Sequence, residues 1–283
     1  MIGAAAAPVL ALAHALALAH PPAWAPRPLV AETFASPAAA VVAALGDAGA
    51  ANSAEVVAFG ELHQTAGTAR VRSTLARFTD EILPAVAPRA AHLIVETWVS
   101  RGTCGAPEKR VTEDIARTTE RPAQTENEIV RLLRRAKELG VAPHVLDVDC
   151  HEYQTVAAGG HVDYDGLLKL TRAHLQRAIE QGLALPRAAG RPLVLVYGGA
   201  LHNDLAPAPV LAAYSFGPAI DALTGGAYRE VDLYVPELVD TLPALRVEPW
   251  FPVWKAAAGA DGKAAILIRR QPRSAVVLFP RGE

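Results

Sequence analysis

The feature that most constrains the fold of this chain is a regular alternation of short apolar runs with longer helical patterns. Five apolar runs have the length of a buried strand: 56–59, 92–95, 145–148, 192–197 and 228–235. Helical patterns fill segments between them: 68–86, 125–139, 165–183 and 219–223. Strands that alternate with helices form right-handed βαβ units. We therefore predict an α/β fold, with a mainly parallel sheet flanked by helices on both faces.

The two ends of the chain depart from this alternation. The segments 264–268 and 275–279 are short apolar runs separated by a Gln-Pro turn, which predicts a short C-terminal antiparallel addition to the sheet. Three prolines in 26–37 predict a linker. Since no internal repeat is visible, we expect 38–283 to form a single α/β domain.

Residues 1–25 contain no Lys, Arg, Asp or Glu, and 9–19 is an apolar run with one His. A transmembrane helix needs about 20 apolar residues, so this run is too short to span a bilayer. It suits the core of a signal peptide, although no basic residue precedes it. We predict a signal peptide and an exported protein, periplasmic or secreted, with no transmembrane span in the mature chain. An Ala-rich tail is the alternative.

The chain has two cysteines, Cys104 and Cys150. Each would lie just beyond the end of a predicted strand, on the same edge of the sheet, so a disulfide between them is geometrically allowed. An oxidising compartment would permit such a bond. We predict the disulfide for an exported protein, with two unrelated thiols as the alternative.

The charge distribution argues against two classes of partner. The formal net charge is −2 and no block of like charges occurs, so we expect neither a nucleic-acid surface nor an anionic-membrane surface. Arg131, Arg134 and Arg135 gather at helical spacing beside apolar residues, which is typical of a solvated helix face. The partner we expect is a small-molecule or peptide substrate.

Acidic residues and histidines follow four of the predicted strands. Glu61 and His63 come after the first strand, and Glu96 ends the second. His202 follows the fourth strand. Because ligands bind outside the carboxyl ends of parallel strands, we expect these side chains to share one site. The third strand is followed by further candidates for cofactor binding, Asp149 and His151.

The spacing of Glu61 and His63 suits proton transfer or metal binding. Two residues apart on a strand, their side chains project to one face. A carboxylate beside an imidazole can activate water, and together with His202 the pair could bind Zn, Mn or Fe. Glu96 would be partly desolvated and would need a partner or a metal. The structural alternatives are a strand-end ion pair and, for His202, an incidental turn residue.

Glycines precede both the Glu61–His63 pair and His202. Gly198 and Gly199 follow a buried strand, and their backbone amides could face a substrate oxygen. Gly60, directly before Glu61, predicts the close approach of another backbone segment or an unusual turn. The sequence signatures of serine hydrolases, zincins, phosphate-binding loops and dinucleotide folds are absent, which disfavours those classes.

The motifs resemble those of one known superfamily. A strand that runs into Gly60-Glu61-Leu62-His63, a strand that ends in Glu96, and a later Gly199-Ala200-Leu201-His202 are similar to the Tiki, erythromycin esterase and ChaN-like haem-binding group. The stretch 214–238 also resembles the helix and strand that follow the second motif in ChaN-like members, and the similarity covers 55–238. Gln64-Thr65 replaces the Asp-Asn common there, and no Cys near the N-terminal segment offers a lipid-attachment site.

The resemblance implies more than one function. Tiki-like members are metal-dependent proteases, erythromycin esterases hydrolyse a macrolide lactone, and ChaN-like proteins are haem-binding uptake lipoproteins. By analogy with the hydrolases, Glu61, His63 and His202 would be catalytic or metal-binding, and Glu96 would support them. By analogy with ChaN-like members, the same edge would bind haem. We predict a hydrolase of an ester, lactone or amide; a haem- or iron-binding exported protein and a fold with an inactive site are the alternatives.

Overall fold

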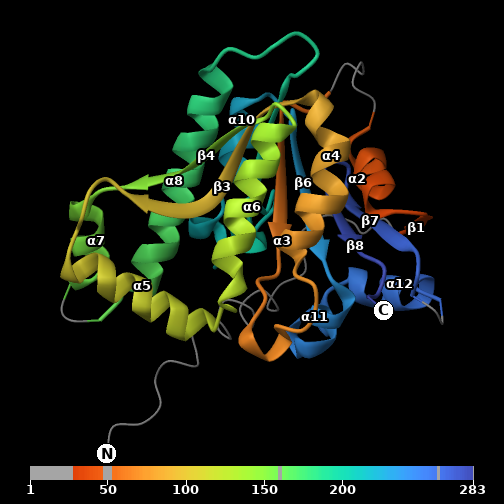
Figure 1. Ribbon diagram of the computed structural model, residues 1–283. Coiled ribbons are helices and arrows are strands. Elements are labelled where there is room, and N and C mark those ends of the chain that lie inside the picture. The colour runs from red at the N-terminus through yellow and green to blue at the C-terminus, as the bar shows by residue number, and fades with distance from the viewer. Residues whose placement is uncertain (1–27, 47–52, 159–160, 260–261, 283) are drawn as a thin grey trace, which may run out of the picture.

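The computed structural model describes residues 28–46, 53–158, 161–259 and 262–282, and the predicted signal peptide lies outside them. At the centre of this part of the chain is an eight-stranded sheet with the order β1-β7-β8-β6-β2-β5-β3-β4 (Figure 1). The strands are β1 (Ala31–Phe34), β2 (Val56–Glu61), β3 (Ala90–Ser100), β4 (Ala142–Val148), β5 (Leu193–Gly199), β6 (Tyr228–Tyr234), β7 (Ala265–Gln271) and β8 (Ser274–Leu278).

The sheet confirms the predicted α/β class. Neighbouring strands from β8 to β4 are parallel, whereas β7 pairs antiparallel with β8, as predicted, and with β1. One expectation is corrected: the predicted linker 26–37 contains β1, whose Ala31 is paired with Ile268 of β7. The side chains of this edge strand are exposed or half-buried, so it lacks the apolar run that identifies a buried strand.

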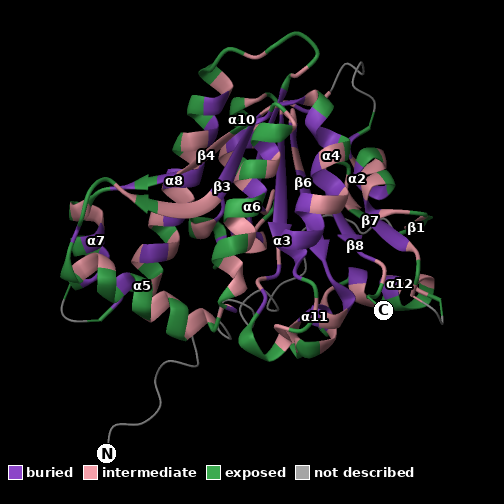
Figure 2. Cartoon of the chain, in the orientation of Figure 1, coloured by how far each residue is buried: buried purple, intermediate pink, exposed green. Residues whose placement is uncertain are grey.

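Helices cover both faces of the sheet, as predicted. The main buried clusters show α2, α3, α4 and α6 on one face, and α8 and α10 on the other. Figure 2 shows the central strands buried between them. The helices are α2 (Pro37–Leu45), α3 (Thr74–Arg77), α4 (Leu83–Val86), α5 (Ala106–Thr119), α6 (Gln124–Glu138), α7 (Cys150–Val156), α8 (Tyr164–Ala184), α9 (Ala200–Asn203), α10 (Gly217–Leu223), α11 (Pro236–Thr241) and α12 (Trp250–Ala257). Shorter turns are η1 (Ala66–Thr68), η2 (Phe78–Ile82), η3 (Ala87–Arg89), η5 (Ala212–Tyr214) and η6 (Pro243–Val247).

Two helical regions differ from the predictions. The predicted helix 68–86 is divided, because the π-helical turn η2 lies between α3 and α4, and Pro84 lacks the N–H that a regular helix needs. α5 lies in 102–122, where no helix is predicted, since Val111 is its buried residue and a clear apolar stripe is missing. None of the described helices is long and apolar enough to cross a membrane.

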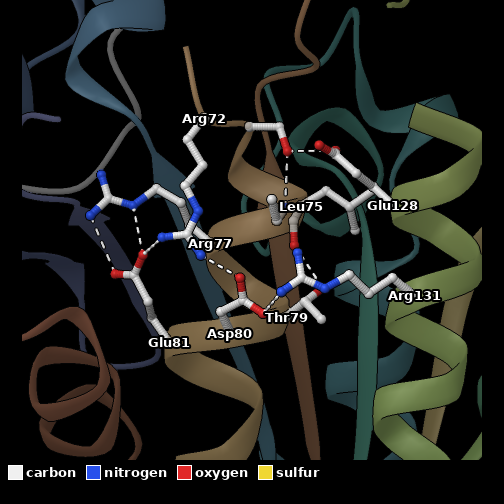
Figure 3. A network of polar contacts seen from close by, with 10 residues as sticks. Arg72, Leu75, Arg77, Thr79, Asp80, Glu81, Glu128 and Arg131 are labelled. Atoms are coloured by element: carbon white, nitrogen blue, oxygen red, sulfur yellow. Dashed lines mark hydrogen bonds and ion pairs between the residues drawn. The ribbon is translucent and has the colours of Figure 1, made fainter. Parts of the chain in front are cut away.

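A polar network joins α6 to the helices that connect β2 and β3 (Figure 3). Asp80 of η2 accepts hydrogen bonds from both Arg72 and Arg131. Ser73 donates to the carboxylate of Glu128 in α6 at 2.6 Å. Arg131 thus lies on an exposed helix face with an acidic neighbour, in agreement with the helix face predicted there.

Cys104 and Cys150 form a disulfide with Cα atoms 4.9 Å apart, which confirms the predicted bond. Cys104 lies between β3 and α5, and Cys150 begins α7, so the bond joins the starts of the two helices. Val111 and Tyr153 belong to a third buried cluster around it. We call residues 104–121 and 150–156 the cap; α5 and α7 lie together beyond the ends of β3 and β4 (Figure 1).

Candidate functional site

Four of the predicted site residues gather where the neighbouring strands β2, β5 and β3 end or diverge. Glu61 is the last residue of β2, and His63 follows it. His202 lies on α9, which begins directly after β5. Since β5 lies between β2 and β3, the sheet order brings residues that are far apart in the sequence to one edge.

Glu96 reaches this edge in a different way from the prediction. β3 does not end at Glu96 but continues to Ser100. Its pairing with β5 stops at Val95, and its register against β4 shifts between Ile94 and Trp98. Glu96 therefore lies where β3 bends away from β5, and its side chain packs against Gly198 and Gly199 at the end of that strand.

Glu61 and His63 form a hydrogen-bonded pair. Nδ1 of His63 lies 2.7 Å from Oε1 of Glu61, and the hydroxyl of Tyr197 donates to Oε2 of Glu61 at 2.5 Å. Burial and the charge of Glu61 raise the pKa of Tyr197 well above its usual value, so the hydroxyl keeps its proton. The His63 side chain is 27% exposed and that of Glu61 11%, so solvent reaches the imidazole more than the carboxylate.

Arg121, from the loop after α5, fixes the tautomer of His63. Its Nη2 lies 2.8 Å from Nε2 of His63. A guanidinium can only donate, so Nε2 must accept. The ring proton therefore resides on Nδ1, which donates to Glu61. His63 is neutral in this network, and its Nε2 lone pair points away from Glu61 toward Arg121.

Glu96 is held by the backbone of β5 and lies beside the second imidazole. Its Oε2 accepts from the amide of Gly199 at 2.7 Å, and its Oε1 lies 3.8 Å from Nε2 of His202. Burial opposes ionisation, but His202 and His63 in their protonated forms, Arg121 and the Gly199 amide together hold the pKa of Glu96 below its usual value. Glu96 is therefore a carboxylate at neutral pH, and the Gly199 amide faces it in place of the predicted substrate oxygen.

His202 is buried, with 4% of its surface exposed. Its Nδ1 lies 2.8 Å from the carbonyl oxygen of Tyr214. A carbonyl can only accept, so Nδ1 carries a proton and donates to it, and Nε2 is the ring atom that faces Glu96. Both site imidazoles thus donate through Nδ1 and present Nε2 toward the interior of the cluster.

The glycines of the two motifs make room for these groups. A Cβ at Gly198 would lie 2.5 Å from Oε2 of Glu96, and one at Gly199 would lie 2.9 Å from Nε2 of His63. A Cβ at Gly60 would lie 2.8 Å from the Cα of Ala200, which is the close backbone approach predicted for that position. Side chains at these positions would displace the site residues or α9.

Glu61, His63 and His202, the predicted metal ligands, lie at the same edge of the sheet but differ in the contacts they make. Among the described residues, no three His, Cys, Asp or Glu side chains are placed to hold a metal ion. Glu61 has one oxygen bonded to His63 and the other to Tyr197, so it orients the imidazole. By donor chemistry, Nε2 of His63, Nε2 of His202 and the Glu96 carboxylate fit a divalent metal better, because a histidine ligand usually donates its other N–H to an oxygen.

Asp149 and His151, the predicted cofactor-binding residues, have local roles or exposed positions. Asp149 caps α7, accepting from the amide of Glu152 at 2.9 Å, and Glu152 accepts from the amide of Asp149 at 2.9 Å. His151 is exposed in the first turn of α7. In the described part of the chain no side-chain contact joins either residue to Glu61, His63 or His202.

Sequence reasoning missed two residues of the site. Tyr197 ends the apolar run of β5, directly before the two glycines, so a polar group at the end of a buried strand was the available signal. Arg121 lies between two helices and contacts His63 across 58 positions of sequence. No periodicity or motif marks Arg121, and only the tertiary structure brings it to the cluster.

A buried charged group lies next to α9. Arg270 lies 2.7 Å from Asp232 and also pairs with Glu230. Nδ2 of Asn203 donates to Asp232 at 3.1 Å, which ties the end of α9 to β6. Burial raises the pKa of Glu230 to about 8 and also raises the pKa of Asp232, while Arg270 opposes both shifts. The group fixes the short helix that carries His202.

Comparisons with known proteins do not assign a family to this chain. No family model matches it, and neither the curated proteins nor the solved structures give a significant match. The geometry of the site is therefore the basis for assigning a function.

Proposed function

We propose that this protein is an exported hydrolase of ester, lactone or amide bonds, with His63 as its general base. The observation that carries the proposal is the Glu61–His63 pair, in which Nδ1–H is bonded to a carboxylate, Nε2 accepts from Arg121, and the imidazole is 27% exposed. A carboxylate in this position holds the tautomer and stabilises the imidazolium that forms during catalysis. The resemblance of the Gly60–His63 and Gly199–His202 motifs to the hydrolases named above supports the same reading.

Each polar side chain of the site has a role in such a reaction. Nε2 of His63 takes a proton from a water molecule that adds to the substrate carbonyl, and Glu61 stabilises the resulting imidazolium. His202 and Glu96 form the second pair: an imidazolium 3.8 Å from the Glu96 carboxylate gives its proton to the leaving group, and the proton that His63 took from water passes through solvent to restore it. Tyr197, bonded to Glu61, keeps the carboxylate aligned with the His63 ring.

A metal-dependent mechanism is the second candidate. The Nδ1–H groups of both imidazoles are hydrogen-bonded to oxygen, as is usual for histidines that bind a metal. Nε2 of His63, Nε2 of His202 and the Glu96 carboxylate would hold it, once Arg121 has moved from His63. When bound, such an ion supplies Lewis-acid activation of a carbonyl or of water. The same two Nε2 atoms are the groups that would bind haem or iron, since imidazole is a common iron ligand.

The proposal is tested by screening mature protein against chromogenic esters, lactones and peptides, and by repeating the assay with His63→Ala and Glu61→Gln. Loss of the general base should lower kcat roughly 10²- to 10⁴-fold. His151→Ala is a matched control, because this exposed imidazole lies outside the cluster, and it should leave the rate unchanged. Activity that survives in His63→Ala would refute the assignment. Elemental analysis and a haem titration of the same preparations distinguish the metal and haem alternatives.

A further inference from the structure

Arg121 reaches the site through a constrained piece of backbone. It directly follows Glu120, which ends α5 in the left-handed region at a φ of 47°. For a residue other than glycine this conformation costs on the order of 1 kcal/mol or more, and such strain gathers at functional sites. The Glu120 carbonyl accepts from the amide of Ala66 at 2.6 Å, so the segment that delivers Arg121 is bonded to the loop that follows His63.

The guanidinium of Arg121 makes no direct ion pair with a described residue, although the charge of Glu96 lies near enough to interact with it. Within the described residues, no carboxylate lies within ion-pair distance of its guanidinium, and its side-chain hydrogen bond is made to the neutral imidazole of His63. Its Nε is buried and has no hydrogen-bond partner. Two other arginines with shielded side chains do have carboxylate partners: Arg270 contacts Glu230 and Asp232, and Arg77 pairs with Glu81. A guanidinium held at a site without a carboxylate partner has donor capacity left for a ligand.

The same contact blocks the proposed base. Nη2 of Arg121 occupies the Nε2 lone pair of His63, which is the atom that must accept a proton from water. A water molecule can take this position only when the guanidinium shifts away. An anion that bonds to Arg121 would draw the guanidinium from the neutral imidazole, since two opposite full charges attract each other more strongly than a cation attracts a neutral acceptor.

We propose that Arg121 recognises a carboxylate carried by the substrate, and that this contact releases Nε2 of His63 for catalysis. The release of His63 for catalysis rests on the proposed hydrolytic function. The substrate would be an ester, lactone or amide with a carboxylate near the bond to be cleaved. Arg121 is thereby a specificity-determining residue that also controls access to the base.

A carboxylate fits this place better than a doubly charged phosphate. Glu61 and Glu96 already contribute two negative charges to the cluster, and a dianion would be repelled more strongly than a monoanion. The planar guanidinium fork matches the two oxygens of a carboxylate. A ligand can also reach this place from solvent. His63, the partner of Arg121, is the most exposed of the three side chains Glu61, His63 and Glu96.

The test measures binding without turnover, by isothermal titration calorimetry with benzoate and with benzamide, its neutral isostere. Wild-type protein should bind benzoate and discriminate against benzamide. Arg121→Gln should weaken benzoate binding roughly tenfold or more, and Arg121→Lys should retain part of it. Arg117→Gln is the matched control, because Arg117 is on α5, is 69% exposed and pairs with Asp114. Near-UV circular dichroism establishes that each variant is folded.

A second measurement follows the release of His63. The ¹⁵N NMR signal of its Nε2 should change when benzoate is added to the wild-type protein, and should already be changed in ligand-free Arg121→Gln. Equal affinity for benzoate and benzamide, no benzoate binding, or full benzoate binding by Arg121→Gln would overturn the proposal. These outcomes are independent of hydrolysis, so an inactive protein that binds benzoate through Arg121 would refute the hydrolase assignment alone.

Discussion

The site is built from two regions that are held in place by different forces. One is the sheet half, in which Glu61, Glu96 and His202 extend from the central strands and from α9. The other is the cap, which supplies Arg121 from the end of α5. Figure 2 shows the contrast: the central strands are buried, whereas α5 is largely exposed or half-buried.

The burial of each region explains how its residues are positioned. Every residue of β5, and every residue of β2 except Glu61, is buried, so hydrophobic packing fixes the sheet half. α5 buries Val111 and depends on individual bonds: the disulfide at its start, and Tyr164, which donates to the carbonyl of Asp114 at 3.0 Å. The comparison indicates that the sheet half is preformed and that the cap is the part able to move when a ligand binds.

Removing the disulfide should produce the largest difference in local stability between the cap and the sheet half. The bond spans 46 residues, and the chain-entropy relation gives about 4 kcal/mol for a loop of this length. In Cys104→Ser/Cys150→Ser we expect amide exchange in α5 and α7 to accelerate roughly a hundredfold or more, with little change in β2 and β5. Hydrogen exchange measures both regions at once. Reduction of the wild-type protein is the control, and equal acceleration throughout the sheet would contradict the division.

A substitution in the sheet half should instead destabilise the whole molecule. In Gly60→Ala the new Cβ would lie 2.8 Å from the Cα of Ala200 and 2.7 Å from Nδ2 of Asn203. We expect a loss of about 3 kcal/mol in the free energy of unfolding, since overpacked buried sites cost that much. Gly67→Ala is the matched control, because its nearest neighbour, Oγ1 of Thr65, would be 3.8 Å away. Equal denaturation midpoints for the two variants would show that the packing around Gly60 adapts.

The sheet half should also respond to pH through Glu230. Burial raises its pKa from 4.5 to about 8, so the folded protein holds a proton that the unfolded chain releases between these values. Stability is therefore fully present below pH 4.5 and falls as the pH rises through 8. Because Asp232 and Arg270 share the titration, we expect a decrease on the order of 2 kcal/mol. Glu230→Gln should flatten this dependence in urea unfolding followed from pH 5 to 9, and an unchanged slope would assign the effect to another group.

Much of the sheet half could be predicted from the sequence. The apolar runs gave the parallel strands, and the residues that follow them, Glu61, His63 and His202, reach one edge because parallel strands align their carboxyl ends. Gly60 was predicted to allow close approach, and the approaching backbone is that of Ala200. These features depend on local periodicity and on a topological rule, both of which a single chain reveals.

The remaining features depend on distant contacts. The bend of β3 at Glu96, the antiparallel pairing of β1 and the arrival of Arg121 at His63 arise from how separate segments pack. The sequence by itself determined the fold class and the residue types at the edge of the sheet, because burial imposes a period on strands and helices. Only the tertiary structure decided the hydrogen-bond partners of the imidazoles and the cation that faces His63, because hydrogen bonds between residues far apart in sequence leave no periodic signal.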